Sequence, residues 1–252
     1  MHLVLIGIGT GNPEHMTVQG IRELNACDLV LVPRKGAAKD DLAELRREIC
    51  GRYLENPATR MVEFDLPVRD PGSPYREGVE AWHRAIAATY RDLLATHAGA
   101  ASRVGLLVWG DPSLYDSTLR ILGHLAAMGV AFEHSVVPGI TSLQALAAGH
   151  RVALNEVGGE VRILTGRRLR EEGASAGKAA GEATLLVVLD GDCAFRGLPE
   201  DWEIRWGAYL GMPEEMLIAG PLAEVGERIV AERAAARAAH GWIMDTYLLR
   251  RR

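Results

Sequence analysis

The chain has 252 residues, with 28 lysines and arginines against 33 aspartates and glutamates, so its formal net charge is −5. This acidic balance argues against a general binder of nucleic acid or of anionic membranes, which would carry a basic excess. The three cysteines form no C-x-x-C pair, and the eight histidines form no H-E-x-x-H or H-x-H pattern. We therefore predict neither a disulfide framework nor a metal site.

Apolar runs are short throughout the chain. No stretch approaches the roughly 18 apolar residues that a membrane-spanning helix needs. The first residues lack a basic region and a cleavage site, and we interpret them as a strand rather than a signal peptide. These features predict a cytoplasmic protein that binds neither nucleic acid nor membrane.

Strand-like and helical patterns alternate over the first 150 residues. Strands are predicted at 2–7, 28–32, 60–65, 103–109 and 131–137, and helices at 16–26, 38–53, 74–97, 114–128 and 140–149. We expect Pro33 to end the second strand, Ser73 to cap the third helix ahead of Pro74, and Val18 to face the core. Repeated strand-helix units with continuous apolar strands predict a parallel sheet covered by helices on both faces.

The pattern changes after about residue 150. Strands are predicted at 160–166, 183–189, 203–210 and 240–249, and a helix at 222–239. Several of these strands are close together in sequence, which favours antiparallel pairing. The segment 170–183 is interpreted as a helix or a surface loop, and residues 250–252 as a frayed tail. We predict two α/β domains, 1–145 with a parallel sheet and 146–252 with a mixed sheet.

Three loops rich in glycine and proline follow strands of the first domain. They are Gly7-Ile8-Gly9-Thr10-Gly11-Asn12-Pro13, Gly110-Asp111-Pro112 and Pro138-Gly139-Ile140-Thr141-Ser142. Taken singly, each has an ordinary explanation as a tight turn, an aspartate cap or a helix N-cap. In open parallel sheets, however, ligands bind beyond the carboxyl ends of the strands. We therefore expect the three loops to converge at one edge of the sheet, formed by the carboxyl ends of its strands, which we call the rim.

The first loop admits a second interpretation, an NADP-dependent reductase. Arg34 and Lys35 follow the second strand and would suit a cofactor that carries a 2′-phosphate. Against this interpretation, Asn12 stands where the dinucleotide motif has its third glycine, and Pro13 interrupts the loop before the helix.

The ordered set of three loops resembles the signatures of the tetrapyrrole methylases. The resemblance runs by motif from residue 1 to about residue 150, and to the end by length and strand pattern. Asn12 and Met16 replace residues that are commoner in the family. Family members are S-adenosylmethionine-dependent enzymes of two α/β domains with a cleft between them. The resemblance implies the same fold here, and a homodimer.

The resemblance also implies site residues. Cofactor contacts are expected at Pro13, Gly110, Asp111, Leu114, Thr141, Ser142, Leu189, Leu210 and Gly211. Substrate contacts are expected at Gly9, Thr10, Gly11, Arg34 and Arg167. No metal is expected.

Within the family, the stretches 4–13, 109–118, 217–222 and 241–247 resemble those of enzymes that act on precorrin-5. The implied reaction is methyl transfer from S-adenosylmethionine to carbon 1 of precorrin-5. Water and the loss of acetate complete it, giving precorrin-6A and S-adenosylhomocysteine. Another precorrin C-methyltransferase, or a tetrapyrrole carrier without catalysis, remains an alternative.

Catalytic candidates follow from the chemistry of acetate loss, in which a positioned base or oxyanion donor would help water attack the acetyl carbonyl. Tyr115 and Asp116 are the candidates for this acid-base work, and Asp245 is a further polar candidate. Because precorrins carry several carboxylates, a subset of arginines and lysines should hold them. The candidates are Arg34, Lys35, Arg69, Arg76, Arg151, Arg167, Arg168 and Arg170.

Overall fold

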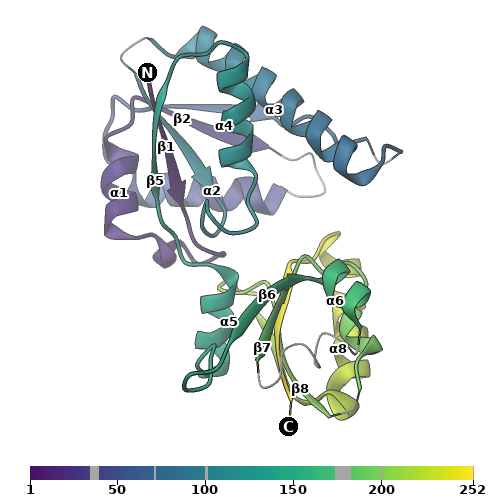
Figure 1. The fold of residues 1–252 in the computed structure, drawn as a ribbon. Coiled ribbons are helices and arrows are strands. Elements are labelled where there is room, and N and C mark those ends of the chain that lie inside the picture. The colour runs from purple at the N-terminus through teal and green to yellow at the C-terminus, as the bar shows by residue number, and fades with distance from the viewer. Residues whose placement is uncertain (35–39, 71, 100–101, 174–182, 200, 252) are drawn as a thin grey trace. The chain divides into compact units, whose positions relative to one another are not determined.

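The computed structural model describes residues 1–252 except 35–39, 71, 100–101, 174–182, 200 and 252. The chain forms two compact units (Figure 1). The first consists of Met1–Gly9 and Pro13–Ile140, and the second of Thr10–Asn12 and Thr141–Arg252.

The first unit contains a five-stranded parallel sheet in the order β3-β2-β4-β1-β5. Its strands are β1 (His2–Gly7), β2 (Leu29–Arg34), β3 (Arg60–Asp65), β4 (Arg103–Val108) and β5 (Glu133–Val137). Its helices are α1 (Val18–Asn25), α2 (Asp40–Tyr53), α3 (Tyr75–His97) and α4 (Thr118–Ala127), with a short 3-10 helix η1 (Pro13–His15). The predicted order of elements and the parallel sheet are confirmed.

Helices cover both faces of this sheet, as the continuous apolar strands predicted. Because side chains alternate along a strand, Leu3 of β1 packs in one cluster with Ile86 of α3, to which α4 also contributes. Val4 packs on the opposite face with Leu24 of α1, in a cluster that includes residues of α2. The helices lie on the two sides of the sheet in Figure 1.

The second strand does not end at Pro33, contrary to prediction. β2 continues to Arg34, pairing with β3 along its whole length but with β4 only as far as Leu31. Beyond Leu31 one side of the strand has no partner among the described strands, so the missing N–H of Pro33 leaves no gap in a ladder there.

Two details of the helices also differ from prediction. Helix α3 begins at Tyr75, and the Ser73 hydroxyl donates to Asp70 at 2.7 Å instead of capping the helix. Val18, expected to face the core, is 84% exposed because it is the first residue of α1, where Thr17 is the cap.

The second unit contains a mixed sheet in the order β6-β7-β10-β8-β9. Its strands are β6 (Val161–Thr165), β7 (Thr184–Val188), β8 (Trp202–Ala208), β9 (Met216–Pro221) and β10 (Asp245–Arg251). Its helices are α5 (Ser142–His150), α6 (Gly166–Glu172) and α8 (Leu222–His240), with a 3-10 helix η3 (Ala194–Gly197). Strands β6 and β7 are parallel and the other pairs antiparallel, which confirms the expected antiparallel pairing.

The sequence missed β9 and misjudged the C-terminal residues. β9 lies at the edge of the sheet and ends in Gly220 and Pro221, residues that indicate a loop when only the sequence is considered. The predicted frayed tail is wrong for Arg250 and Arg251, which belong to β10. Of the segment 170–183, residues up to Glu172 complete α6, and 174–182 lie outside the described residues.

The core of the second unit is built around large aromatic side chains, since Trp202, Trp206, Phe195 and Tyr247 are fully buried. The chain's three cysteines are buried and unbonded, in agreement with the prediction of no disulfide. Among the described helices, none is long and apolar enough to cross a membrane.

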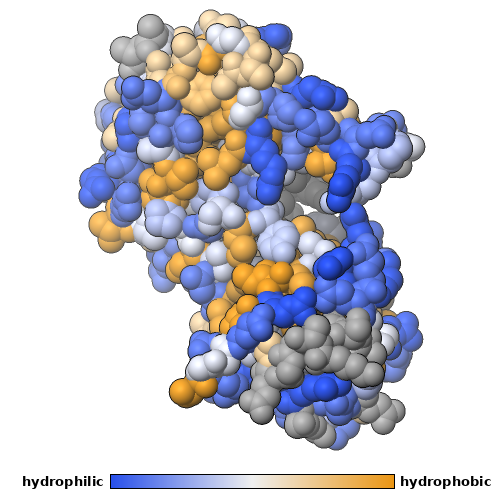
Figure 2. Space-filling model, in the orientation of Figure 1, coloured by the Kyte–Doolittle hydropathy of each residue, from blue (hydrophilic) through white to orange (hydrophobic). Residues whose placement is uncertain are grey.

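The face of the molecule in Figure 2 carries mostly hydrophilic residues, with apolar ones between them.

Candidate functional site

The loops after β4, β1 and β5 leave three neighbouring strands, because β1 lies between the other two in the sheet. Gly9, in the loop after β1, forms a bridge with Gly110, in the loop after β4. The Gly110 N–H donates to the Gly9 carbonyl at 2.8 Å. The predicted convergence of the three loops on one rim is confirmed for their residues in the first unit.

Close packing of backbone explains the glycines at this rim. A Cβ atom on Gly139 would lie 2.1 Å from the carbonyl oxygen of Gly110, and one on Gly7 would lie 2.6 Å from the Gly139 nitrogen. Both separations are far below van der Waals contact, so a side chain at either position would push the loops apart. Glycine is required at these positions because the backbones of the loops pack directly against each other and leave no room for a Cβ atom.

Asp111 ties two of these loops together. It is only 9% exposed, and its Oδ1 accepts from the backbone N–H and the hydroxyl of Ser113, while its Oδ2 accepts from the Gly139 N–H at 2.8 Å. Burial pushes the pKa of Asp111 upward, but the hydrogen bonds from Ser113 and Gly139 outweigh it, so the pKa lies below its usual value. Asp111 is therefore ionised at neutral pH and holds the loops after β4 and β5 together at the rim, a contact that we call the Asp111 clamp.

The residues after Asp111 are not helical, although a helix was predicted from residue 114. The Leu114 N–H donates to the Asp111 carbonyl, and Tyr115 has a φ of +52° and a side chain that is 45% exposed. A positive φ at a non-glycine residue is a strained conformation that concentrates at functional sites. Tyr115 thus presents its ring at the surface of the rim.

Asp116 lies two residues before Thr118, the first residue of helix α4, and Ser117 holds the N-cap position between them. The Oδ1 of Asp116 accepts from the N–H of Thr118 at 2.6 Å, so this carboxylate satisfies the first N–H group of the helix. Its charge also acts on the guanidinium of Arg46. The carboxylate thus has a structural partner in this structure, and acid-base work at this residue stays a prediction.

Arg46 is a cation near the rim that the sequence reasoning missed. It lies on α2, and its Nε donates to the carbonyl of Leu107, near the carboxyl end of β4. Burial lowers the pKa of this guanidinium, whereas the charges of Tyr90 and Asp116 act in the opposite direction. No sequence signal separated Arg46 from its neighbour Arg47, because both stand in an amphipathic helix whose charged residues are typical of a solvated face.

Thr141 and Ser142, the last two residues of the third loop, belong to the second unit. Thr141 is the N-cap of α5, as predicted, and the Gln144 side chain accepts from both its N–H and its hydroxyl, each at 2.7 Å. Ser142 is the first residue of the helix. Two hydroxyls therefore stand at the start of α5, where the first backbone N–H groups have no partner within the helix ladder.

Residues 10–12 of the first loop also belong to the second unit, where they pack against the turn after β8. Gly11 has a φ of +145°, and a Cβ there would lie 2.3 Å from the Met212 side chain and 3.1 Å from the Leu210 carbonyl oxygen. The turn is strained at Tyr209, a non-glycine residue with a φ of +50°, whereas Gly211 adopts its φ of +81° without strain. The predicted substrate contact Gly11 and the predicted cofactor contacts Leu210 and Gly211 are thus neighbours.

Leu189 and Arg167 flank a second contact between strand ends. Leu189, directly after β7, has a φ of +53° and is 64% exposed, an unusual combination for a large apolar residue. A Cβ on Gly166 would lie 2.4 Å from the carboxyl carbon of Asp190, so the chain after β6 packs tightly against the chain after β7. Exposed Arg167 and Leu189 are next to these two residues in sequence.

The basic candidates are largely engaged within their own units. Arg34 pairs with Asp65 at 3.2 Å, Arg168 with Glu172 at 2.6 Å, and Arg170 with Asp192 at 2.5 Å. The Arg69 guanidinium lies over a tyrosine ring. Arg76 and Arg151 are exposed, and Lys35 lies outside the described residues. Which of them contact the substrate's carboxylates stays a prediction.

Asp245, the further polar candidate, is buried in a structural network. Its Oδ2 accepts from the Trp206 ring N–H and from the Nε of Arg233, each at 2.9 Å. Arg233 also donates to the Asp190 carbonyl, and the Asp190 carboxylate accepts from the Tyr247 hydroxyl. The partners of Asp245 are thus fixed side chains of the core of the second unit.

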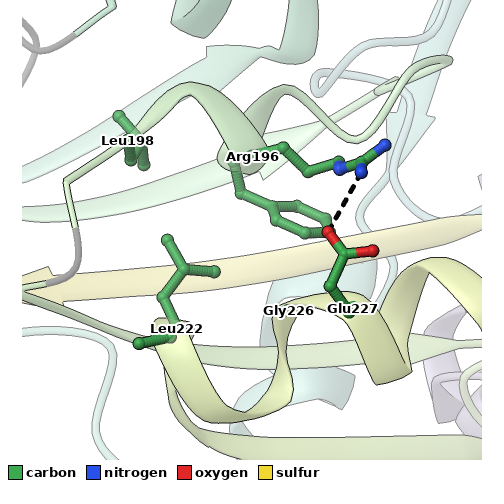
Figure 3. A pocket seen from close by; sticks show the side chains of 7 residues that line it. Arg196, Leu198, Leu222, Gly226 and Glu227 are labelled. Atoms are coloured by element: carbon green, nitrogen blue, oxygen red, sulfur yellow. Dashed lines mark ion pairs between the residues drawn. The ribbon is translucent and has the colours of Figure 1, made fainter.

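A pocket of about 340 Å³ lies elsewhere in the second unit, between η3 and the start of α8 (Figure 3). It is lined by Phe195, Arg196, Leu198, Leu222, Ala223, Gly226 and Glu227. Arg196 and Glu227 form an ion pair at 3.0 Å beside it. None of its lining residues is among the predicted site residues.

Comparison with known proteins finds relatives along the whole chain. Precorrin-6A synthase [deacetylating] from Sinorhizobium sp is 52% identical over 252 residues, which are 99% of this chain and 95% of that protein. Precorrin-4 C(11)-methyltransferase from Pseudomonas aeruginosa is 25% identical over 92% of this chain and 85% of its own length.

Solved structures give the same result. The cobalamin synthesis related protein CobF from Corynebacterium diphtheriae has a TM-score of 0.84 and 35% identity, covering 100% of this chain and 99% of that one. Uroporphyrin-III C-methyl transferase from Thermus thermophilus, complexed with S-adenyl homocysteine, shares the fold with a TM-score of 0.57 and 20% identity, over 99% and 92% of the two chains. The family model of the tetrapyrrole (corrin/porphyrin) methylases matches residues 2–226. The chain is a member of the tetrapyrrole (corrin/porphyrin) methylase family.

Proposed function

We propose that this chain is a precorrin-6A synthase of the deacetylating type, acting in cobalamin biosynthesis. In the proposed reaction a methyl group passes from S-adenosylmethionine to carbon 1 of precorrin-5, and the extruded acetyl group is lost as acetate. The observation that carries the proposal is the 52% identity to the Sinorhizobium enzyme, which extends over 99% of this chain. The lower identity to the precorrin-4 enzyme makes methylation at another carbon the weaker alternative.

The proposed cofactor contacts are Pro13, Gly110, Asp111, Leu114, Thr141, Ser142, Leu189, Leu210 and Gly211. The fold that carries S-adenosyl homocysteine in the Thermus relative supports this choice. Two local features also support it. Asp111 holds the loops after β4 and β5 at fixed separation, and Leu189 keeps a large apolar side chain exposed on a strained backbone.

When bound, the cofactor supplies a methyl group on a sulfonium, which is already strongly electrophilic. The task of the protein is therefore to place the methyl in line with the nucleophilic ring carbon and to exclude water from it. Rigid loops suit this task. The Gly9 and Gly110 bridge and the Asp111 clamp supply rigidity without any covalent nucleophile.

Acetate loss needs different chemistry. Water attacks the acetyl carbonyl, the bond between that carbon and the ring breaks, and its electron pair moves into the macrocycle. Carbon 1 then forms a bond to the methyl while the bond from methyl to sulfur breaks. We propose Tyr115 and Asp116 for the proton transfers that accompany the attack of water, with Gly9, Thr10, Gly11, Arg34 and Arg167 as substrate contacts.

The experiment that tests the function incubates the protein with precorrin-5 and S-adenosylmethionine labelled in its methyl group. The expected products are a methylated corrinoid that carries the label and one free acetate for each methyl transferred. Methylation without acetate would contradict the specific assignment and leave the family intact. Pigment binding without methylation would favour a carrier.

Cofactor choice is tested separately by thermal unfolding. S-adenosylhomocysteine should raise the melting temperature, because a ligand that binds only the folded state stabilises it by mass action. NADPH should leave the melting temperature unchanged, and the reverse result would favour the reductase.

The homodimer and the cytoplasmic location are further proposals. Sedimentation equilibrium checks the homodimer.

A further inference from the structure

Three potential metal ligands meet on one face of the first unit, between helices α3 and α4. Glu80 and His83 stand three residues apart on α3, so they share one side of that helix. His124 comes from α4. One ligand atom from each residue lies within 4.8 Å of the others, and the His124 Nε2 is 3.2 Å from the Glu80 Oε1.

His83 provides an independent reason to look for a ligand here. Its side chain is only 4% exposed, yet its Nε2 has no hydrogen-bond partner among the described residues. A buried polar atom without a partner destabilises the folded state, and such atoms are rare in native proteins. A bound cation would satisfy this nitrogen.

Charged side chains also lie near the cluster. Two cations, Arg120 and Arg84, and the carboxylate of Asp116 lie near the cluster. Glu80 is the acidic member of the cluster.

We propose that Glu80, His83 and His124 bind a divalent transition-metal ion of the zinc class. Two imidazoles and one carboxylate are a known ligand set for Zn²⁺, with water in the fourth position. Water can reach that position because the Glu80 side chain is half-exposed. Zinc bonds of about 2.0–2.1 Å place tetrahedral donors about 3.4 Å apart. Glu80 and His124 already have nearly this separation, at 3.2 Å, and His83 lies within 4.8 Å of both.

The site has a structural consequence. α3 and α4 pack together over the same face of the sheet, so an ion held by both helices would link them. The spacing of the histidines in the sequence predicted no metal, because His124 joins the other two ligands only through the packing of α4 on α3. The test of this site needs neither cofactor nor precorrin, so it does not depend on the proposed methyl transfer.

The test uses the full chain without a histidine tag, freed of metal by dialysis against a chelator. Co²⁺ should give the visible absorption of a four-coordinate nitrogen and oxygen site at one equivalent, and Zn²⁺ should displace it. Zn²⁺ should also raise the melting temperature by several degrees, as a ligand of the folded state does. The absence of both signals would overturn the proposal.

Substitutions of the proposed ligands test where the ion binds. His124→Gln and Glu80→Gln should each weaken Zn²⁺ binding, measured by calorimetry, by about 100-fold or more, since even changes outside the ligand shell cost about 10–100-fold. Both side chains are partly exposed, so the apo variants should fold, which circular dichroism checks. The matched controls are Glu77→Gln, one turn away on α3, and His134→Gln, exposed on β5. Equal binding by all four variants would overturn the site.

Discussion

The carboxylate of Asp111 accepts a hydrogen bond from the backbone N–H of Gly139, with 2.8 Å between oxygen and nitrogen. This bond joins the loop after β4 to the loop after β5, past the end of the strand that separates them in the sheet. The rim of the first unit therefore depends on one buried charge.

Asp111→Asn should lower the free energy of unfolding by about 1–3 kcal/mol at pH 7, because hydrogen bonds to an ionised acceptor are lost. The folded pKa of Asp111 lies below the unfolded value of about 3.9. Its contribution is therefore fully present above that value and is lost as the pH falls through the folded pKa. Urea unfolding at pH 7, 5 and 3.5 should show a constant gap to the wild type at the two higher values and a smaller gap at pH 3.5. Asp92→Asn, on an exposed residue, should show no such gap.

Gly139→Ala should destabilise the protein by about 2 kcal/mol or more and abolish S-adenosylhomocysteine binding, since its Cβ would lie 2.1 Å from the Gly110 carbonyl oxygen. The matched control is Gly123→Ala on α4, where a Cβ would meet nothing within 4 Å. Alanine there should stabilise the helix by about 0.5–1 kcal/mol. Thermal unfolding with and without ligand measures both effects. Normal ligand binding by Gly139→Ala would contradict the role given to the rim.

Asp116→Asn separates a helix cap from an acid-base residue. Asparagine caps a helix about as well as aspartate, so the free energy of unfolding should change by less than about 0.5 kcal/mol. If the carboxylate moves protons, turnover with precorrin-5 should fall by about 100-fold or more. Ser117→Ala, next in sequence and without a capping side-chain bond, should change neither quantity. Full turnover by Asp116→Asn would remove this residue from the mechanism.

Leu189→Gly should leave folding intact, or stabilise it by about 1 kcal/mol, because glycine accepts the φ of +53° without strain. It should nevertheless weaken S-adenosylhomocysteine binding by about 10-fold, since an exposed apolar side chain that would cover the ligand is lost. Calorimetric titration measures the affinity. Unchanged affinity would exclude Leu189 from the cofactor site.

Arg233→Met should lower the free energy of unfolding by about 3–5 kcal/mol, because it leaves the buried carboxylate of Asp245 without its ion-pair partner. Burial already raises the pKa of Asp245, against the opposing effect of Arg233. In the variant the folded pKa rises further, so the protonated form folds best and the stability deficit grows as the pH rises from 5 to 8. Arg196→Met breaks an exposed ion pair and should cost less than about 1 kcal/mol at either pH. Chemical unfolding at the two pH values compares the variants.

Local patterns predicted most of the secondary structure and the positions of the three glycine- and proline-rich loops. The order of elements up to α5 follows from apolar periodicity, and the glycines of the three loops follow from their place after strands. Predictions at the edges were weaker. β9 was missed because its Gly220 and Pro221 are typical of a loop. Arg250 and Arg251 were predicted to be a frayed tail, whereas they belong to strand β10.

The acidic composition argued against a general polyanion binder, and the placement of the glycines and prolines marked the rim. The sequence by itself determined these features because they depend on backbone conformation within a few neighbouring residues. Only the tertiary structure decided that Asp111 reaches Gly139, that Arg46 reaches the end of β4 and that His83 meets His124. These contacts join residues far apart in the chain, and only the packing of whole helices and strands brings such residues within bonding distance.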